Sequence, residues 1–210
     1  MAYISRRMKT TQILTAIYVF CHLCFQDINA QGLLKNAKYI EIGGLVGFGK
    51  PMDQFSVPEG SYNPTIFVGH FSMDLIRQEK IRRLFPGRFL LVSEPQVNYV
   101  RIQSSPAKNA WEFGLITLLQ YMYPIGPRVH IYVVGGTGPF WFSAHTIEQK
   151  QGFIFCNYLG AGVYLFPFKN EKLAINIGFR ARHMSNANLW MPNNGINSHL
   201  ITIGFSKFLK

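Results

Sequence analysis

The chain has 210 residues, 48% of them hydrophobic and 15% aromatic, and a formal net charge of +11 at pH 7. This length fits one domain of ordinary size. A basic charge suits nucleic acid, anionic lipid or acidic polysaccharide, but no DNA- or RNA-binding motif is visible, so we expect no nucleic-acid partner.

The first thirty residues have the pattern of a secretory signal peptide. Arg6, Arg7 and Lys9 precede an apolar run over 13–25, and Ala30 is a small residue suited to cleavage. The run is too short for a membrane anchor. We therefore expect 1–30 to be a signal peptide and 31–210 to be one exported domain.

Removing 1–30 leaves 21 − 3 = 18 Lys and Arg against 10 − 1 = 9 Asp and Glu, a net charge of +9. The same cut removes the Cys21 and Cys24 pair, so Cys156 is the one cysteine of the mature chain and has no partner for an internal disulfide.

The rest of the chain consists of short runs rich in aromatic and β-branched residues, separated by Gly, Pro and Asn. They predict eight strands, at 38–48, 63–75, 87–102, 110–120, 128–136, 153–166, 172–184 and 197–208. Two are less regular. The run at 63–75 continues toward 80–83 in a pattern that also fits a helix, and Pro95 interrupts 87–102.

The last three predicted strands have one apolar face and one small or polar face. A soluble sandwich or barrel would turn the apolar face inward, whereas a transmembrane barrel turns it outward to lipid. The export signal, the aromatic content and the polar-face arginines favour the second. We expect 31–210 to form an outer-membrane β-barrel domain, all-β, with eight antiparallel transmembrane strands. In it, Arg180 and Arg182 would pair with acids of neighbouring strands.

A Ser–His pair lies at the end of one such apolar face. His183 lies in the predicted strand 172–184, and Ser185 follows directly after it. Because a single residue separates the two, their side chains point to the same side of the strand. A base beside a hydroxyl is the core of nucleophilic acyl transfer. If the barrel begins and ends on the periplasmic side, the hairpin 185–197 lies outside and His183, Ser185 and Asn197 face lipid of the outer leaflet.

The motif around this pair, His183-x-Ser185-Asn186-Ala187 followed by Pro192-Asn193-x-Gly195, resembles the lipid A 3-O-deacylase (PagL) family. The resemblance implies an eight-stranded outer-membrane barrel whose membrane-facing Ser–His–Glu site removes an ester-linked acyl chain from lipopolysaccharide. It implies Ser185 as the nucleophile and His183 as the general base. Asn186 and Asn193 would shape the site, and Asn193 is the better candidate to donate to the oxyanion.

The chain departs from the family pattern at two positions. Asn197 stands where the family has its acid, and Asn188 where it usually has glycine. Asn197 can accept from the His183 ring and fix its tautomer, but it cannot offset the charge of an imidazolium. Glu148, in the expected loop 137–150, is a candidate replacement acid, and His199 a candidate second base.

The expected function is therefore deacylation of lipid A (lipopolysaccharide) in the cell outer membrane by Ser–His chemistry, with no cofactor and no metal. The alternative, which Asn197 favours, is a non-catalytic outer-membrane β-barrel with a structural or lipid-binding role. A soluble secreted barrel that binds an apolar ligand is the third possibility.

Overall fold

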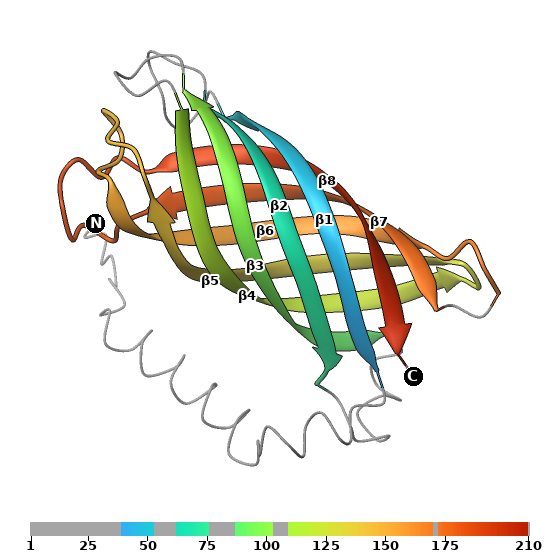
Figure 1. Cartoon of the computed structure of the whole chain (residues 1–210). Coiled ribbons are helices and arrows are strands. Elements are labelled where there is room, and N and C mark those ends of the chain that lie inside the picture. Colours follow the sequence, from blue (N-terminus) through green and yellow to red (C-terminus); the bar gives the residue numbers. More distant parts are fainter. Residues whose placement is uncertain (1–38, 53–61, 76–86, 103–108, 170–171, 210) are drawn as a thin grey trace, which may run out of the picture. The chain divides into compact units, whose positions relative to one another are not determined.

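A computed structural model describes residues 39–52, 62–75, 87–102, 109–169 and 172–209 of the chain (Figure 1). The expected signal peptide with Cys21 and Cys24, and the run at 80–83, lie outside these residues. Eight strands close into one barrel in chain order, each antiparallel to its neighbours. They are β1 (Ile40–Pro51), β2 (Tyr62–Asp74), β3 (Arg88–Ile102), β4 (Asn109–Gly126), β5 (Val129–Phe142), β6 (Gly152–Leu165), β7 (Leu173–Ser185) and β8 (Ile196–Leu209).

All eight predicted strands are confirmed, but β4 and β5 are longer than the predicted 110–120 and 128–136. The glycines of β5 explain the difference. A Cβ at Gly136 or Gly138 would overlap backbone atoms of β4, so glycine is what allows the two strands to pair there. The loop predicted at 137–150 is correspondingly shorter and occupies 143–151.

The prediction that Pro95 interrupts its strand is wrong. The register between β2 and β3 is the same on both sides of it, with Val68 opposite Gln96 and Phe71 opposite Ser93. Gly69 lies beside Pro95, and a Cβ there would be 3.1 Å from the proline Cγ. The absence of a side chain at Gly69 makes room for the ring inside a continuous sheet.

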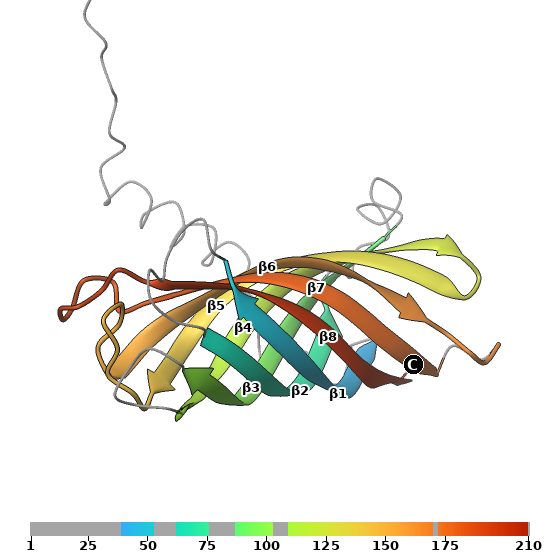
Figure 2. The ribbon, with the colours of Figure 1, turned by 90° about the horizontal axis from the view of Figure 1, so that it is seen from above.

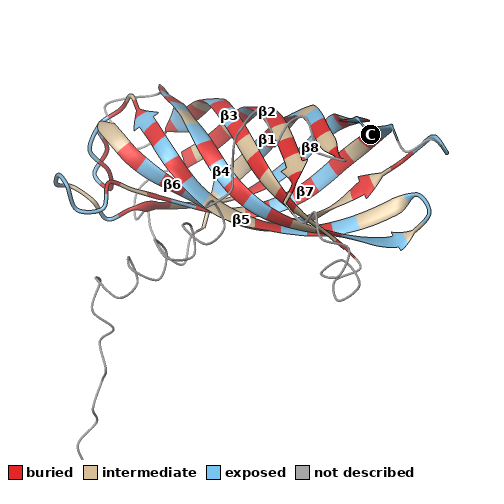
Figure 3. Cartoon of the chain, turned by 90° about the horizontal axis from the view of Figure 1, so that it is seen from below, coloured by how far each residue is buried: buried red, intermediate tan, exposed pale blue. Residues whose placement is uncertain are grey.

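Side chains alternate between the outside and the inside of the barrel (Figure 3). The outside carries the exposed large apolar residues, and aromatic side chains lie toward both ends, including Tyr99, Trp111 and Trp141 at one end and Tyr121 and Tyr123 at the other. The barrel seen from above, with strongly tilted strands, is shown in Figure 2. An apolar outer band between aromatic girdles is the arrangement of a transmembrane barrel. Within the described ranges, no helix is long and apolar enough to cross a membrane.

The barrel interior is filled by both apolar and polar side chains, rather than by small or polar residues alone. Ile66, Leu118 and Tyr164 are fully buried there alongside Glu94, Asn98 and Thr202. An eight-stranded barrel is just wide enough for side chains to fill it.

Two buried ion pairs join opposite walls of the barrel. Arg180 on β7 forms two hydrogen bonds with Glu94 on β3, one of them at 2.9 Å between Nη2 and Oε1. Arg182 donates from Nη1 to Oε2 of Glu112 on β4 at 2.8 Å. The arginines therefore do pair with acids, but across the barrel and not on neighbouring strands as we expected. Long side chains let a narrow barrel be bridged directly.

Further polar groups complete both pairs. His70 bonds Glu94 through Nδ1 at 2.9 Å and lies 3.3 Å from Glu41 through Nε2. Arg182 also donates to the Ser198 hydroxyl, at 3.0 Å, and to the Tyr62 hydroxyl, at 3.2 Å. Such partners are what make a buried charge tolerable.

We predict that Arg180→Met lowers the free energy of unfolding by about 3–5 kcal/mol, because the buried Glu94 carboxylate loses the guanidinium that donates two hydrogen bonds to it and keeps only His70 and Gln96. Urea unfolding in detergent micelles, followed by tryptophan fluorescence, measures the loss. The double variant Arg180→Met/Glu94→Gln removes the orphaned charge and should recover part of it. A single variant as stable as the parent would show that the pair does not support the barrel.

Candidate active site

The ladder between β7 and β8 places His183 directly opposite Asn197, and their side chains bond. His183 Nδ1 lies 2.7 Å from Asn197 Oδ1. An amide oxygen only accepts, so the imidazole nitrogen is the donor and Nδ1 carries the proton. The neutral ring then has its lone pair on Nε2, which is the state a general base needs.

Ser185 lies two residues further along β7, on the same outward face as His183. Arg182, which precedes His183, and Met184, which lies between His183 and Ser185, point into the barrel and are buried. His183 is exposed and Ser185 is half-buried. Phe155 of β6 stands opposite Ser185 in the ladder. The structure thus confirms that His183, Ser185 and Asn197 share the outer surface, at the end of β7 where the apolar stripe stops.

Gly195 lies directly against the His183 ring. Its φ is +77°, a conformation that side-chain-bearing residues rarely adopt, and a Cβ built on it would be 2.8 Å from Cε1 of His183. The motif includes this glycine, but the sequence alone does not explain why glycine is needed at this position. The reason is the close approach of imidazole and backbone.

The loop between β7 and β8 is organised by its asparagines. Asn193 Oδ1 accepts from the backbone N–H of Asn186 at 2.8 Å, and Asn193 Nδ2 donates to Asn188 Oδ1 at 2.8 Å. Asn186 Nδ2 donates to the carbonyl of Trp190. Asn188 has φ +63°, so the position where the resemblance suggested glycine does adopt the left-handed conformation, which asparagine tolerates better than most residues.

The neighbouring loop at 143–151 docks against this hairpin loop at the same end of the barrel (Figure 1). Lys150 N donates to Pro192 O at 3.0 Å, and Asn194 N donates to Glu148 O at 2.8 Å. Glu148 therefore contacts the site region through its backbone. Among the described residues, no hydrogen bond or ion pair joins its carboxylate to His183. The ring of His199, the other candidate base, stacks on Phe179 at 6.2 Å between centroids.

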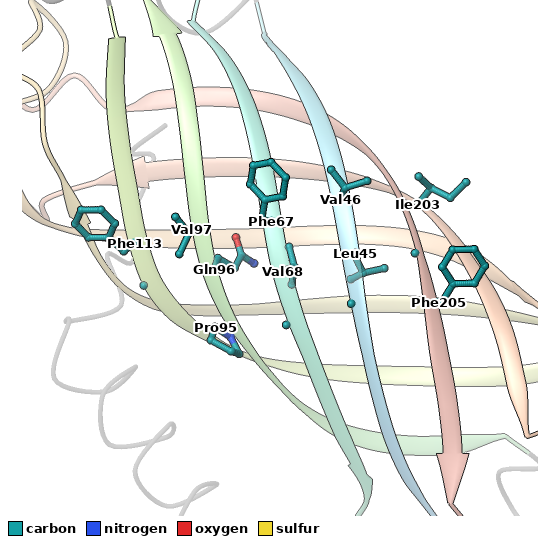
Figure 4. Close-up of a pocket in the computed structure, with 14 residues that line it drawn as sticks. Leu45, Val46, Phe67, Val68, Pro95, Gln96, Val97, Phe113, Ile203 and Phe205 are labelled. Carbon is teal, nitrogen blue, oxygen red and sulfur yellow. The ribbon is translucent and has the colours of Figure 1, made fainter.

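An apolar hollow of about 800 Å³ lies elsewhere on the outer surface, over β8 and β1 to β4 (Figure 4). Its lining includes Phe67, Val97, Phe113 and Phe205, with Gly44 and Gly69 between them. None of the residues of the Ser–His site lines it.

We predict that Gly195→Ala displaces the His183 ring, because the new methyl group and Cε1 cannot both keep their places. The imidazole Nδ1–H signal of the folded barrel in micelles, read by proton NMR, should shift or vanish. Gly44→Ala is the matched control, since a Cβ there would meet only ordinary contacts, the nearest at 3.6 Å. An unchanged signal in Gly195→Ala would contradict this role.

Comparison with known proteins agrees with this fold. A sequence model of the family described as lipid A 3-O-deacylase (PagL) matches residues 82–206, more than half of the chain. A comparison with curated protein sequences gave no match.

Among solved structures, the outer membrane enzyme PagL aligns with a TM-score of 0.51 and 20% identity, over 78% of this chain and 97% of that one. Neisserial surface protein A aligns with a TM-score of 0.51 and 10% identity, over 80% of this chain and 95% of that one. At such identities these structures show the shared fold, an eight-stranded barrel of the outer-membrane type. The family match goes further, and from it the chain belongs to the lipid A 3-O-deacylase (PagL) family.

Proposed function

We propose that this protein is an outer-membrane lipid A deacylase that hydrolyses an ester-linked acyl chain with Ser185 as nucleophile and His183 as general base. In this proposal residues 1–30 direct export and are removed. The observation that carries it is the 2.7 Å contact from His183 Nδ1 to Asn197 Oδ1, made on the apolar outer surface beside Ser185. A lipid substrate reaches such a site from within the membrane.

The reaction begins when Ser185 Oγ attacks the acyl carbonyl carbon while its proton passes to His183 Nε2. The tetrahedral intermediate collapses, and the sugar hydroxyl leaves with the proton from His183. The acyl-enzyme is then hydrolysed by a water molecule that His183 activates in the same way. Asn197 holds the ring in the required tautomer throughout.

The oxyanion of each intermediate needs donors aimed at it. We assign this role to Asn193, whose Nδ2 has a second hydrogen besides the one given to Asn188. Asn186 acts indirectly, as a positioning residue. Its side-chain amide donates to the carbonyl of Trp190 and so supports the loop, and its backbone N–H donates to Asn193 Oδ1 and so orients Asn193.

The charges near the site suit a phosphate-bearing lipid. Lys50 stands opposite His199 at the junction of β1 and β8, and Lys150 is exposed in the loop that docks on the hairpin. Cations at this level would face the anionic headgroup while the apolar outer wall contacts the acyl chains.

We predict that Ser185→Ala abolishes deacylation, because the alanine methyl group cannot attack the acyl carbonyl carbon. Mass spectrometry of lipid A from outer membranes with and without the protein measures the loss of one acyl chain. Thr65→Val, which removes a hydroxyl from the outer face of β2 far from the site, is the control. Unchanged lipid A in the presence of the folded parent protein would instead support the non-catalytic barrel.

We predict that Asn197→Leu lowers kcat by about 10²-fold or more, since the ring loses the acceptor that fixes its tautomer. Asn197→Asp keeps an acceptor on a side chain of the same length and should retain at least the parent rate. Turnover of a purified lipid A in mixed micelles distinguishes the variants. Equal rates for Asn197→Leu and the parent would remove Asn197 from the mechanism.

A further inference from the structure

The apolar hollow on the outer surface has a floor of residues without bulky side chains (Figure 4). Gly44 of β1 and Gly69 of β2 stand directly opposite each other, and both face outward. The Pro95 ring of β3 lies beside Gly69, where a Cβ would be 3.1 Å from the proline Cγ. A Cβ at Gly44 would meet nothing closer than 3.6 Å. The floor is therefore open toward the membrane.

Larger apolar side chains border this floor. The ladders place one set on the side toward the Ser–His site and another on the opposite side, and a phenylalanine closes the end at β8. These residues are Val46, Phe67 and Val97 toward the site, Ile42 and Phe71 on the opposite side, and Phe205 on β8. Neighbouring strands are about 4.8 Å apart, so the floor from β1 to β3 extends over about 10 Å. A depression of this width, with apolar walls, suits a hydrocarbon chain.

The hollow lies in the half of the membrane away from the Ser–His site. Phe205 is eight residues from Asn197 along β8, which is about 27 Å at about 3.4 Å per residue. Strands of outer-membrane barrels are tilted by about 35–45°, so this separation corresponds to about 19–22 Å of depth. Half of the hydrocarbon core is about 15 Å. Asn197 is one residue from the start of β8, so Phe205 and Gly44 lie beyond the midplane and meet lipid of the opposite leaflet.

Two lysines lie next to the hollow, on the side away from the Ser–His site. Lys207 is exposed on β8 opposite Ile42, which makes it the diagonal neighbour of Gly44 at about 7–8 Å. Lys172 is exposed and directly precedes Leu173, the partner of Lys207 in the ladder between β7 and β8. Within the described ranges, no ion pair involves Lys207. The hollow therefore has positive charge at the edge that is nearest to the membrane surface of that leaflet.

An apolar hollow next to two cations is complementary to a lipid that carries both an acyl chain and a net negative charge. Lysine stems lie along apolar surface and bring the ammonium group to the membrane interface, where lipid phosphates are found. A zwitterionic lipid supplies the acyl chain without the net charge. The charge of the two lysines thus favours an anionic phospholipid over a neutral one.

We infer that the hollow is a binding site for an anionic phospholipid of the leaflet opposite the Ser–His site. Lys207 and Lys172 contact its phosphate, and one of its acyl chains lies against Gly44 and Gly69. The inference goes beyond the proposed function and does not depend on it, because none of these residues belongs to the Ser–His site.

Native mass spectrometry of the protein, purified from membranes in a non-ionic detergent, measures which lipids stay bound. The probes are phosphatidylglycerol and phosphatidylcholine with identical acyl chains, titrated separately. A lysine near a membrane surface strengthens binding of anionic lipid by about 5-fold. We expect one phosphatidylglycerol to bind about 5- to 30-fold more tightly than phosphatidylcholine. Lys207→Gln should lower its affinity about 5-fold, and Lys172→Gln/Lys207→Gln should remove the preference.

Gly44→Leu places a side chain in the hollow and should weaken the binding of both lipids. Gly135→Leu is the matched control, because it adds the same side chain to the outer face of β5, outside the hollow, where a Cβ meets only ordinary contacts from 3.5 Å. Arg101→Gln is the charge control, since it removes one exposed cation from the end of β3 that lies near the Ser–His site. Both controls should retain phosphatidylglycerol as the parent does.

Equal affinities of the parent for the two lipids would overturn the inference. So would a preference that survives Lys172→Gln/Lys207→Gln, or binding of both lipids that Gly44→Leu leaves unchanged. A dimer that retains neither lipid and dissociates in Gly44→Leu would mean that a second copy of the chain occupies the hollow, which also overturns the inference.

Discussion

The strict alternation of side chains along β7 is the constraint on which the rest of this structure depends. Arg180 and Arg182 point into the barrel, and His183 and Ser185 point out of it, within six consecutive residues. The inward residues fix β7 to β3 and β4 through ion pairs, so the backbone beneath the Ser–His pair is tied to the opposite wall. A rigid strand is what a site on an outer surface needs, because lipid cannot hold side chains in place.

The amide at position 197 has a physical logic in this setting. A carboxylate facing lipid must be desolvated, which costs free energy whenever it is not paired with a cation. An amide oxygen offers the His183 ring an acceptor at 2.7 Å without that cost. It gives up the stabilisation of the imidazolium during the reaction and keeps the control of the tautomer.

The sequence was sufficient for the features that depend on local pattern. Runs rich in aromatic and β-branched residues located all eight strands. Period-two alternation gave the outward face of His183 and Ser185, and the motif around them, with Pro192-Asn193-x-Gly195, pointed to the family. The features that it could not give depend on register and on contacts across the barrel. Nothing in the sequence pairs Arg180 with Glu94 rather than with an acid on an adjacent strand, or places the loop at 143–151 against the hairpin loop. Pro95 and the glycines of β5 read as breaks, because their accommodation depends on a neighbouring strand.

The docking of the loop at 143–151 onto the hairpin loop uses main-chain groups, through Lys150 N with Pro192 O and Asn194 N with Glu148 O. Main-chain hydrogen bonds are present whatever side chain a residue carries, proline donors excepted. The exposed tips, such as Ile147 and Met191, are therefore free to change in sequence without loosening the frame around the site. A change of side chain in these loops therefore leaves the backbone frame around His183 and Ser185 in place.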